Sequence, residues 1–433
     1  MHPEPITLLW FRRDLRLHDN RALEAALAAG RDVLPLFIFD RHILDPLDRD
    51  DARVSFIHLT LHGMHRQLCD HGSGLLVCTG TPAEVLQRLV QQYNIGTVFA
   101  GEDYEPYGIR RDHKVKELLA GSGISLQLIK DHLIFRPGEV LKDDGQPYTV
   151  YTPFMRKWKT LFHKEMAEPI PPAVHAGKWH RHDPEFPSLR QIGFSSAEIT
   201  VPDWDLSEAT LRNYLHTRDL PAQDGTSHAG PHLRFGNLSV REAVRAALKH
   251  SETFLNELIW REFFAHILWY FPEVVHRSFK SAFEFFPWEN DPEKISRWMN
   301  GTTGFPLVDA GMRQLVRTGT MHNRVRMVTA SFLVKDLLVD WRIGEAFFAR
   351  HLLDFELASN NGNWQWAAGT GCDAAPFFRI FNPSEQQRKF DPEMGYIQHW
   401  VPEYGTSAYP RPMVDHTEAR KHAMQILKSL RDA

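Results

Sequence analysis

Residues 354–366 combine acidic, amide and indole side chains at high density. Two acids, three asparagines and two tryptophans fall within this stretch. A solvated loop would not carry two tryptophans. A core would not hold so many amides without partners, because an unpaired buried polar group costs about 1–3 kcal/mol. Amides and indoles together indicate a site for a large heteroaromatic ligand, such as a flavin or a nucleobase.

Two other stretches place polar and apolar groups on one helical face. Glu257, Trp260 and Arg261 stand at i, i+3 and i+4. They suit a planar polar ligand, although a surface ion pair beside a core tryptophan gives the same pattern. Asn323 and Met327 are four residues apart and could bind a base-like ring by hydrogen bonding and soft packing. The alternative is an ordinary helix start with Asn323 as its cap.

A short stretch of small and hydroxyl-bearing residues, 225–231, follows Tyr214 and Arg218. It stops at Pro231, a residue type that often opens a helix. Backbone amides at a helix start bind phosphate, so the stretch fits a pyrophosphate site. A surface turn is an equal alternative.

The elements that must position these residues change character along the chain. Up to residue 135, helix-like segments alternate with short apolar or β-branched runs at 6–11, 33–39, 74–78, 97–100 and 126–128. This alternation predicts right-handed βαβ units and a mostly parallel sheet. The glycine-rich dinucleotide fingerprint is absent after the first run, where the sequence is Phe-Arg-Arg-Asp-Leu-Arg.

Residues 136–205 are rich in proline, which breaks long regular elements, so we expect an extended linker there. Beyond it, helical periodicity and most of the twelve tryptophans indicate an all-α domain. The expected helices are 207–215, 239–250, 252–269, 292–301, 307–318, 323–340 and 343–353. The predicted domains are therefore an α/β Rossmann-like domain over 1–135, the linker, and an all-α domain over 206–433.

The composition narrows the class of protein. The 433 residues carry a net charge of −4 and are 43% hydrophobic, a globular balance that excludes a globally basic nucleic-acid protein but not a local basic patch. No apolar run reaches the roughly 18–20 residues of a membrane helix, and no signal-peptide core opens the chain. Three cysteines fit a reduced compartment. We expect a soluble, cytoplasmic protein without a metal site.

Four segments resemble the photolyase/cryptochrome family. Residues 9–20 are similar to the family's opening strand and loop, and residues 362–366, 373–376 and 378–383 are similar to its C-terminal signature. The resemblance covers the whole chain. It implies an N-terminal α/β antenna domain, a linker and a C-terminal helical domain that binds FAD.

The resemblance also implies an enzyme, a deoxyribodipyrimidine photo-lyase, whose partner is UV-damaged DNA containing a pyrimidine dimer. Light-excited, reduced anionic FAD passes an electron to the flipped-out dimer. The alternative is a blue-light photoreceptor (cryptochrome) without repair activity; a flavoprotein that works without light is a remote third. The residues that match the dimer pocket of class I cyclobutane-dimer photolyases are Glu257, Asn323, Trp260, Met327 and Trp366.

Further roles follow from the same resemblance. Plant-type cryptochromes usually carry aspartate at the position of Asn360. The asparagine in this chain favours the reduced flavin needed for repair. Electrons would reach the flavin through Trp364, Trp341 and Trp288, with Trp288 outermost. The expected DNA-phosphate contacts are Arg218, Arg324 and Arg379. The expected FAD contacts are Tyr214, Thr226, Ser227, His228, Ala229, Gly230, Phe254, Arg326, Asp354, Phe355, Glu356 and Asn360.

The chain departs from the family pattern in three places. The phosphate loop usually reads Thr-Ser-x-Leu-Ser, and here Ala229 and Gly230 replace its last two residues. Glu356 replaces a usual aspartate and Phe254 a common tryptophan. Folate-binding relatives carry an asparagine–glutamate pair near 107–108, where this chain has tyrosine and glycine. We therefore expect a deazaflavin antenna, a second flavin or none, rather than folate. We also expect a monomer, nucleoid-associated if the source is bacterial.

Overall fold

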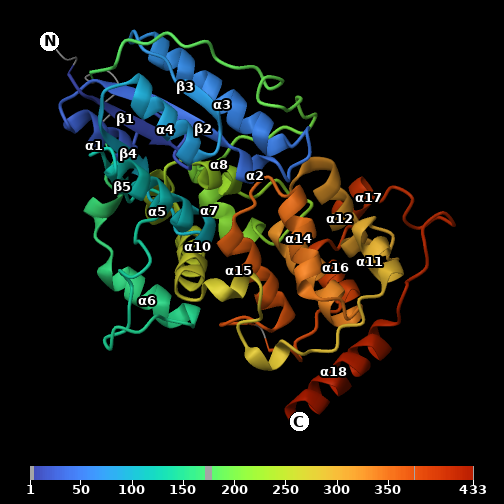
Figure 1. Ribbon diagram of the computed structural model, residues 1–433. Helices are drawn as coiled ribbons and strands as arrows, with labels where there is room; N and C mark the ends of the chain where they lie inside the picture. The colour runs from blue at the N-terminus through green and yellow to red at the C-terminus, as the bar shows by residue number, and fades with distance from the viewer. Residues whose placement is uncertain (1–3, 171–177, 375, 433) are drawn as a thin grey trace. The chain divides into compact units, whose positions relative to one another are not determined.

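The computed structural model describes residues 4–170, 178–374 and 376–432 (Figure 1). Residues 171–177 of the expected linker, and Ala375 of the 373–376 motif, lie outside the described residues. The chain forms two compact units, which we treat separately. The first comprises Met1–Glu139, Leu161–Trp204 and His228–Lys249; the second comprises Val140–Thr160, Asp205–Ser227 and His250–Ala433.

The first unit is built on a five-stranded parallel sheet, which confirms the expected fold class. The strand order is β3-β2-β1-β4-β5, so β2 and β3 extend the sheet on one side of β1, and β4 and β5 extend it on the other. The strand order therefore reverses between β1 and β4. Apolar residues run along the central strands because helices cover both faces of the sheet. The strands are β1 (Ile6–Phe11), β2 (Val33–Asp40), β3 (Leu76–Gly80), β4 (Ile95–Gly101) and β5 (Ser125–Ile129).

Alternate side chains of β1 pack against helices on opposite faces of the sheet. Leu9 and Phe11 pack with α1 (Arg21–Ala28) and α3 (Ala52–Cys69) on one face of the sheet. Leu8 and Trp10 pack with α4 (Pro82–Gln92) and α5 (Pro106–Ala120) on the other. Figure 1 shows these helices on either side of the blue strands. The short α2 (Arg41–Leu44) follows β2, and the 3-10 turn η1 (Lys164–Ala167) also belongs to this unit.

The helix expected over 239–250, observed as α9 (Val240–His250), belongs to this first unit rather than to the all-α part. So does α8 (Ala229–Phe235), which was not among the expected helices. A buried charge network explains why. Arg241 of α9 is 1% exposed and donates hydrogen bonds to Asp19 and Asp131, both at 2.8 Å. Arg16 also binds Asp131. These guanidinium groups hold the pKa of Asp131 well below its usual range despite its burial, which alone would raise it.

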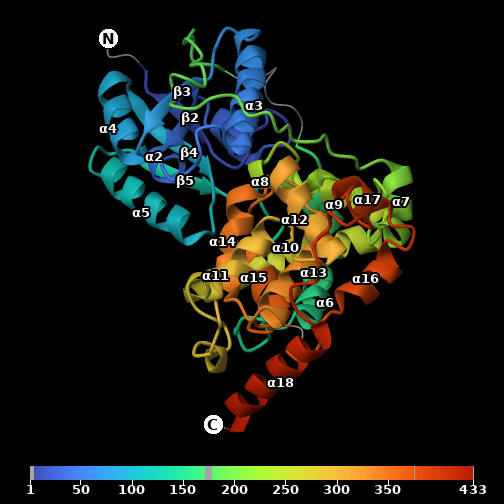
Figure 2. The same ribbon diagram turned by 90° about the vertical axis from the view of Figure 1, so that its right-hand side faces the viewer.

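The second unit is helical, as the sequence predicts (Figure 2). Its largest apolar cluster includes Trp298, Trp341 and Trp364. Its 3-10 turns are η3 (Pro272–Val275) and η4 (Ser281–Phe283). Its α-helices are α6 (Tyr151–Leu161), α7 (Glu208–Thr217), α10 (Glu252–Tyr270), α11 (Pro292–Met299), α12 (Pro306–Thr318), α13 (Asn323–Ser331), α14 (Trp341–His351), α15 (Leu357–Ala368), α16 (Pro383–Phe390), α17 (Gly395–Trp400) and α18 (His416–Asp432).

The helix expected over 323–340 is shorter than predicted. It continues as α13 to Ser331 and then widens into a π-helical turn, η5 (Phe332–Asp336). The Leu337 amide bonds the Phe332 carbonyl at 3.1 Å, five residues back. Such wide turns occur often at functional sites. No helix within the described ranges is long and apolar enough to span a bilayer.

The charge network makes a testable prediction for the first unit. Arg241→Met removes a guanidinium that compensates the buried carboxylates of Asp19 and Asp131. Breaking a buried pair in this way costs about 3–5 kcal/mol. We therefore expect the free energy of unfolding, measured in denaturant at neutral pH, to fall by about that amount. Arg41→Met is the control, because its pair with Asp45 is solvent-exposed. Equal stability of the two variants would contradict the prediction.

Candidate functional site

The turn that follows α7 ties two other helices together. Arg218, the C-cap of α7, donates to a carboxylate oxygen of Glu257 on α10 at 2.6 Å. The next residue, Asp219, accepts from Arg324 at the start of α13 at 2.9 Å. Two oppositely charged neighbours thus bind two helices. The structure thereby draws Glu257, expected to bind a ligand, toward the end of α13 that carries Asn323.

Tyr214 and Phe254 form an aromatic wall beside this turn. The two rings meet edge to face with centroids 5.4 Å apart, and the Arg218 guanidinium lies over Tyr214 at 5.4 Å. Burial, together with the nearby Glu257 carboxylate, raises the pKa of Tyr214 to about 12. The phenol is therefore neutral at physiological pH.

Trp260 is covered by a residue that the sequence did not single out. Tyr151 of α6 stacks on it with centroids 3.6 Å apart and planes 7° from parallel, and Phe264 stacks at 5.4 Å. The Tyr151 amide donates to Asp373 at 2.9 Å, which ties α6 to the C-terminal motif. Tyr151 lies in the range expected to be a linker, where no local pattern marks it as part of a site.

The start of α13 settles one alternative. His322, rather than Asn323, is the N-cap, because its Nδ1 accepts from the Arg324 amide at 3.2 Å. The Asn323 side chain is exposed and Met327 is half-buried. Burial lowers the pKa of His322 to about 4, so this ring is neutral. Its Nε2 is buried without a hydrogen-bond partner among the described residues, which leaves a polar atom for a ligand.

Two acids expected at the ligand site are held by arginines. Asp354 accepts bidentate hydrogen bonds from the Arg326 guanidinium, at 2.9 and 3.2 Å. Glu356, which is almost fully buried, accepts from Arg261 at 3.0 Å. Arg261 thus forms an ion pair with Glu356. On sequence grounds Arg261 was grouped only with Glu257 and Trp260 on its own helix, so this partner was not foreseen. The longer glutamate, in place of the usual aspartate, makes this ion pair.

The Asn360 amide is oriented by a neighbour that the sequence did not single out. Its Nδ2 donates to both the side-chain and main-chain oxygens of Glu345, at 2.8 and 3.1 Å. Burial raises the pKa of Glu345. Because these contacts use the nitrogen, Oδ1 remains as a hydrogen-bond acceptor.

The expected electron-transfer tryptophans occupy two adjoining helices and a loop. Trp341 begins α14 and Trp364 lies in α15, both almost completely buried. Gly344 lets the α14 backbone lie against the Trp364 ring, because a Cβ there would lie 2.2 Å from it. Trp288 is half-buried and packs on Phe286 with centroids 4.1 Å apart. Trp366, expected in the dimer pocket, is also half-buried.

Trp298 is an unforeseen neighbour of this chain of tryptophans. Its ring lies 6.2 Å from that of Trp364, and its indole N–H donates to the Thr329 carbonyl at 3.1 Å. Phe355, expected to contact the cofactor, packs against the same apolar cluster.

The expected phosphate-binding residues fall in both units. Thr226 and Ser227 belong to the second unit, where the Ser227 carbonyl accepts from the Asp205 amide at 2.8 Å. In the first unit, His228 has left-handed backbone geometry at φ 48° and precedes α8, which begins at Ala229 and continues through Gly230. Their joint role as a phosphate site remains a prediction.

The three arginines expected to contact DNA differ in their surroundings. Arg218 and Arg324 are both ion-paired, and Arg324 also lies over the Phe390 ring at 4.3 Å. Of the three, Arg379 is the one whose side chain is open to solvent.

In the first unit, side chains fill the crevice at the point where the strand order reverses, between β1 and β4. The guanidinium groups of Arg12 and Arg111 both lie over Trp10, at 4.9 and 5.2 Å from the ring centroid. Asp112 pairs with both arginines. A space of only about 10 Å³ remains between Arg12 and the neighbouring side chains, including Asp103. This crevice, at the carboxyl ends of β1 and β4, is where open parallel sheets usually bind ligands.

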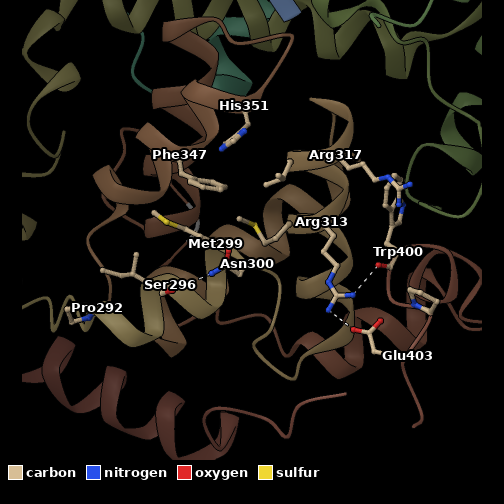
Figure 3. Close-up of a pocket in the computed structure, with 14 residues that line it drawn as sticks. Pro292, Ser296, Met299, Asn300, Arg313, Arg317, Phe347, His351, Trp400 and Glu403 are labelled. Carbon is tan, nitrogen blue, oxygen red and sulfur yellow. Dashed lines mark hydrogen bonds and ion pairs between the residues drawn. The ribbon is translucent and has the colours of Figure 1, made fainter. Parts of the chain in front are cut away.

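A separate pocket of about 930 Å³ lies in the second unit between α11, α12, α14 and α17 (Figure 3). Met299, Phe347 and Trp400 contribute much of its apolar lining, and Arg313 pairs with Glu403 at its edge. None of the residues expected to bind cofactor or substrate lines it.

An α/β unit together with a helical unit rich in tryptophan, paired acids and oriented amides defines a cofactor-binding protein of the flavoprotein type. Residues 7–173 match the family described as DNA photolyase, and residues 254–407 match the FAD binding domain of DNA photolyase. The chain belongs to the DNA photolyase family. The unpaired His322 Nε2 and the Asn360 Oδ1 are free polar atoms of the kind that a flavin would need, so the residues present fit FAD.

Similarity to relatives extends along the whole chain. A deoxyribodipyrimidine photo-lyase from a Synechococcus species is 36% identical over 98% of this chain and 97% of its own length. The Escherichia coli protein of that name is also 36% identical, over 98% of both chains. These relatives confirm the expected family and enzyme class.

Solved structures agree with the fold. A bacterial class III photolyase from Agrobacterium tumefaciens is 33% identical with a TM-score of 0.90, covering 100% of this chain and 99% of its own. A Synechocystis cryptochrome is 26% identical with a TM-score of 0.84, covering 98% of this chain and 100% of its own. The neighbours therefore include both repair enzymes and a cryptochrome.

Proposed function

We propose that this protein repairs cyclobutane pyrimidine dimers in UV-damaged DNA with light energy. The observation that carries the proposal is the Arg218–Asp219 turn, which binds Glu257 of α10 and Arg324 of α13 through ion pairs. It draws together helices that carry a carboxylate, an indole and an amide suited to a pair of pyrimidines. Such side chains would reach the pyrimidines only after these had left the duplex.

The cofactor side of the proposal rests on the residues around α15. Reduced FAD, when bound, would supply the light-driven electron. Asn360 would present Oδ1, an acceptor suited to a protonated ring nitrogen of reduced flavin, because Glu345 engages its amide nitrogen. Arg326 and Asp354 would form a fixed polar edge. Phe355 and Glu356 follow Asp354 directly and would complete this edge.

The pyrophosphate and adenine of FAD would use the remaining expected contacts. Tyr214 and Phe254 would provide the aromatic wall. The backbone of residues 226–230 would donate to the phosphates, since the loss of a serine hydroxyl at Gly230 leaves main-chain N–H groups in place.

On the substrate side, Glu257 and Asn323 would hydrogen-bond the flipped bases, and three apolar side chains would pack against the dimer: Trp260, Trp366 and Met327. Arg218, Arg324 and Arg379 would contact DNA phosphates, which fixes position without reading sequence. Arg218 would serve twice, because its ion pair also orients the Glu257 carboxylate.

The assignment to class I remains a prediction, since a solved neighbour with a TM-score of 0.90 is described as class III. The cryptochrome alternative is supported by a structural neighbour of that name at lower identity. Repair activity is the property that separates the two functions.

We further propose that the crevice of the first unit holds no antenna chromophore, whether deazaflavin or a second flavin. Arg12, Arg111 and Trp10 fill it, and the space left beside them is about the size of one water molecule. The Tyr107 hydroxyl, near the position of the family's folate pair, is engaged by Asp40.

The repair proposal predicts light-dependent loss of the dimer. Chemically reduced protein, mixed with a thymine-dimer oligonucleotide, should restore thymines under blue light and not in darkness. Glu257→Gln should lower repair at subsaturating DNA by about tenfold. The neutral amide cannot replace the charge-assisted hydrogen bonds that the Glu257 carboxylate would make to the flipped bases. Glu252→Gln, an exposed change on the same helix, is the control. Flavin binding without any repair would favour the photoreceptor alternative.

The tryptophan chain makes a second prediction. Trp364→Phe should slow the photoreduction of oxidised flavin strongly, because it interrupts the path that the buried rings form. Repair by chemically pre-reduced enzyme should stay close to wild type. Flash spectroscopy and single-turnover repair measure the two properties, with Trp400→Phe as control. Equal loss of both would contradict this role.

The filled crevice makes a third prediction. After incubation of the holoenzyme with a deazaflavin, the action spectrum of repair should still follow the absorption of the bound flavin alone. Repair sensitised at the deazaflavin absorption band would show that the crevice opens, and would refute the proposal.

A further inference from the structure

Lys335 is a buried cation inside the π-helical turn η5. Its side chain is 1% exposed, and burial lowers its pKa to about 8, so the ammonium form still prevails at neutral pH. A buried ammonium is unfavourable unless it has partners. The adjacent Asp336 carboxylate supports the ammonium electrostatically, and its Oδ1 bonds His416 at the start of α18.

The hydrogen bond of Lys335 goes to a backbone atom in the C-terminal signature. Its Nζ donates to the Arg379 carbonyl at 3.0 Å and lies 5.6 Å from the centre of the Phe377 ring. Phe377 is itself buried against Phe283 and Phe286, with centroids 5.7 and 5.4 Å apart. The lysine therefore holds the main chain at one end of residues 376–380, next to an aromatic anchor.

The same turn presents two exposed side chains. Phe378 is 54% exposed, and the Arg379 side chain is also exposed. The turn is tight, since the Arg379 amide bonds the Pro376 carbonyl at 2.8 Å. An exposed ring beside an exposed guanidinium suits nucleic acid, in which bases stack and phosphates attract arginine.

We propose that Lys335 is a positioning residue for DNA binding, which clamps the turn of residues 376–380 so that Phe378 and Arg379 meet the damaged strand. This rests on the proposed function, in which Arg379 contacts a phosphate. Burying the ammonium costs desolvation free energy that only its partners offset. The value of the ammonium here lies in fixing the position of a backbone carbonyl.

The test is a double-mutant cycle on DNA affinity. Dark binding of the FAD-loaded protein to a duplex with one thymine dimer is measured at several salt concentrations. Arg379→Ala should weaken binding about tenfold and reduce the slope of log K against log salt by about 1. Lys335→Met should weaken binding about three- to tenfold, with a similar loss of slope. The double variant should lose less affinity than the two single losses added together, because both changes act on the Arg379 contact.

Several readouts separate positioning from a general loss of structure. The flavin spectrum and repair at saturating DNA should be unchanged in Lys335→Met, so that KM changes and kcat does not. Lys421→Met removes an exposed cation from the same unit and should leave affinity unchanged. If the methionine variant does not fold, Lys335→Gln, which retains a donor on a shorter side chain, enters the same cycle.

Each outcome decides one point. Additive losses in the double variant, or wild-type affinity in Lys335→Met, would overturn the role of Lys335. Wild-type affinity in Arg379→Ala would instead overturn the phosphate contact of the proposed function, while dimer repair itself could persist.

Discussion

The placement of an acid next to an arginine at the end of α7 is the constraint on which the candidate site depends. Arg218 and Asp219 carry opposite charges, so one short turn binds a carboxylate on α10 and a guanidinium on α13. Neither helix could shift without separating a pair of charges that are partly shielded from water, where their attraction is stronger than at the surface. The turn thus sets the distance between helices that carry the expected substrate contacts.

Local patterns in the sequence predicted the parallel sheet and the helices from α9 to α14, but no helix was expected at α6, α8 or α15 to α18. Long-range partners were predicted poorly. The first strand was predicted at its observed bounds, because an apolar run covered on both faces leaves a clear signal. The π turn, the grouping of α9 with the sheet and the stacking of Tyr151 on Trp260 were not foreseen. Each depends on partners that are distant in sequence and leave no periodic pattern.

The site shows the same division. Arg326 and Asp354 were both expected at the cofactor site from the family resemblance, and they form an ion pair. Glu345 and Arg261 hold Asn360 and Glu356 in place, and the sequence offered no reason to connect them. Side chains that would touch a ligand belong to recognisable motifs, whereas those that orient them are scattered among ordinary helical positions.

The two guanidinium groups over Trp10 have a consequence for how the protein would gather energy. With that crevice occupied by its own side chains, the proposed enzyme would collect photons through its catalytic cofactor alone. In weak light its working rate would be limited by the absorption cross-section of one flavin, however tightly it held a lesion.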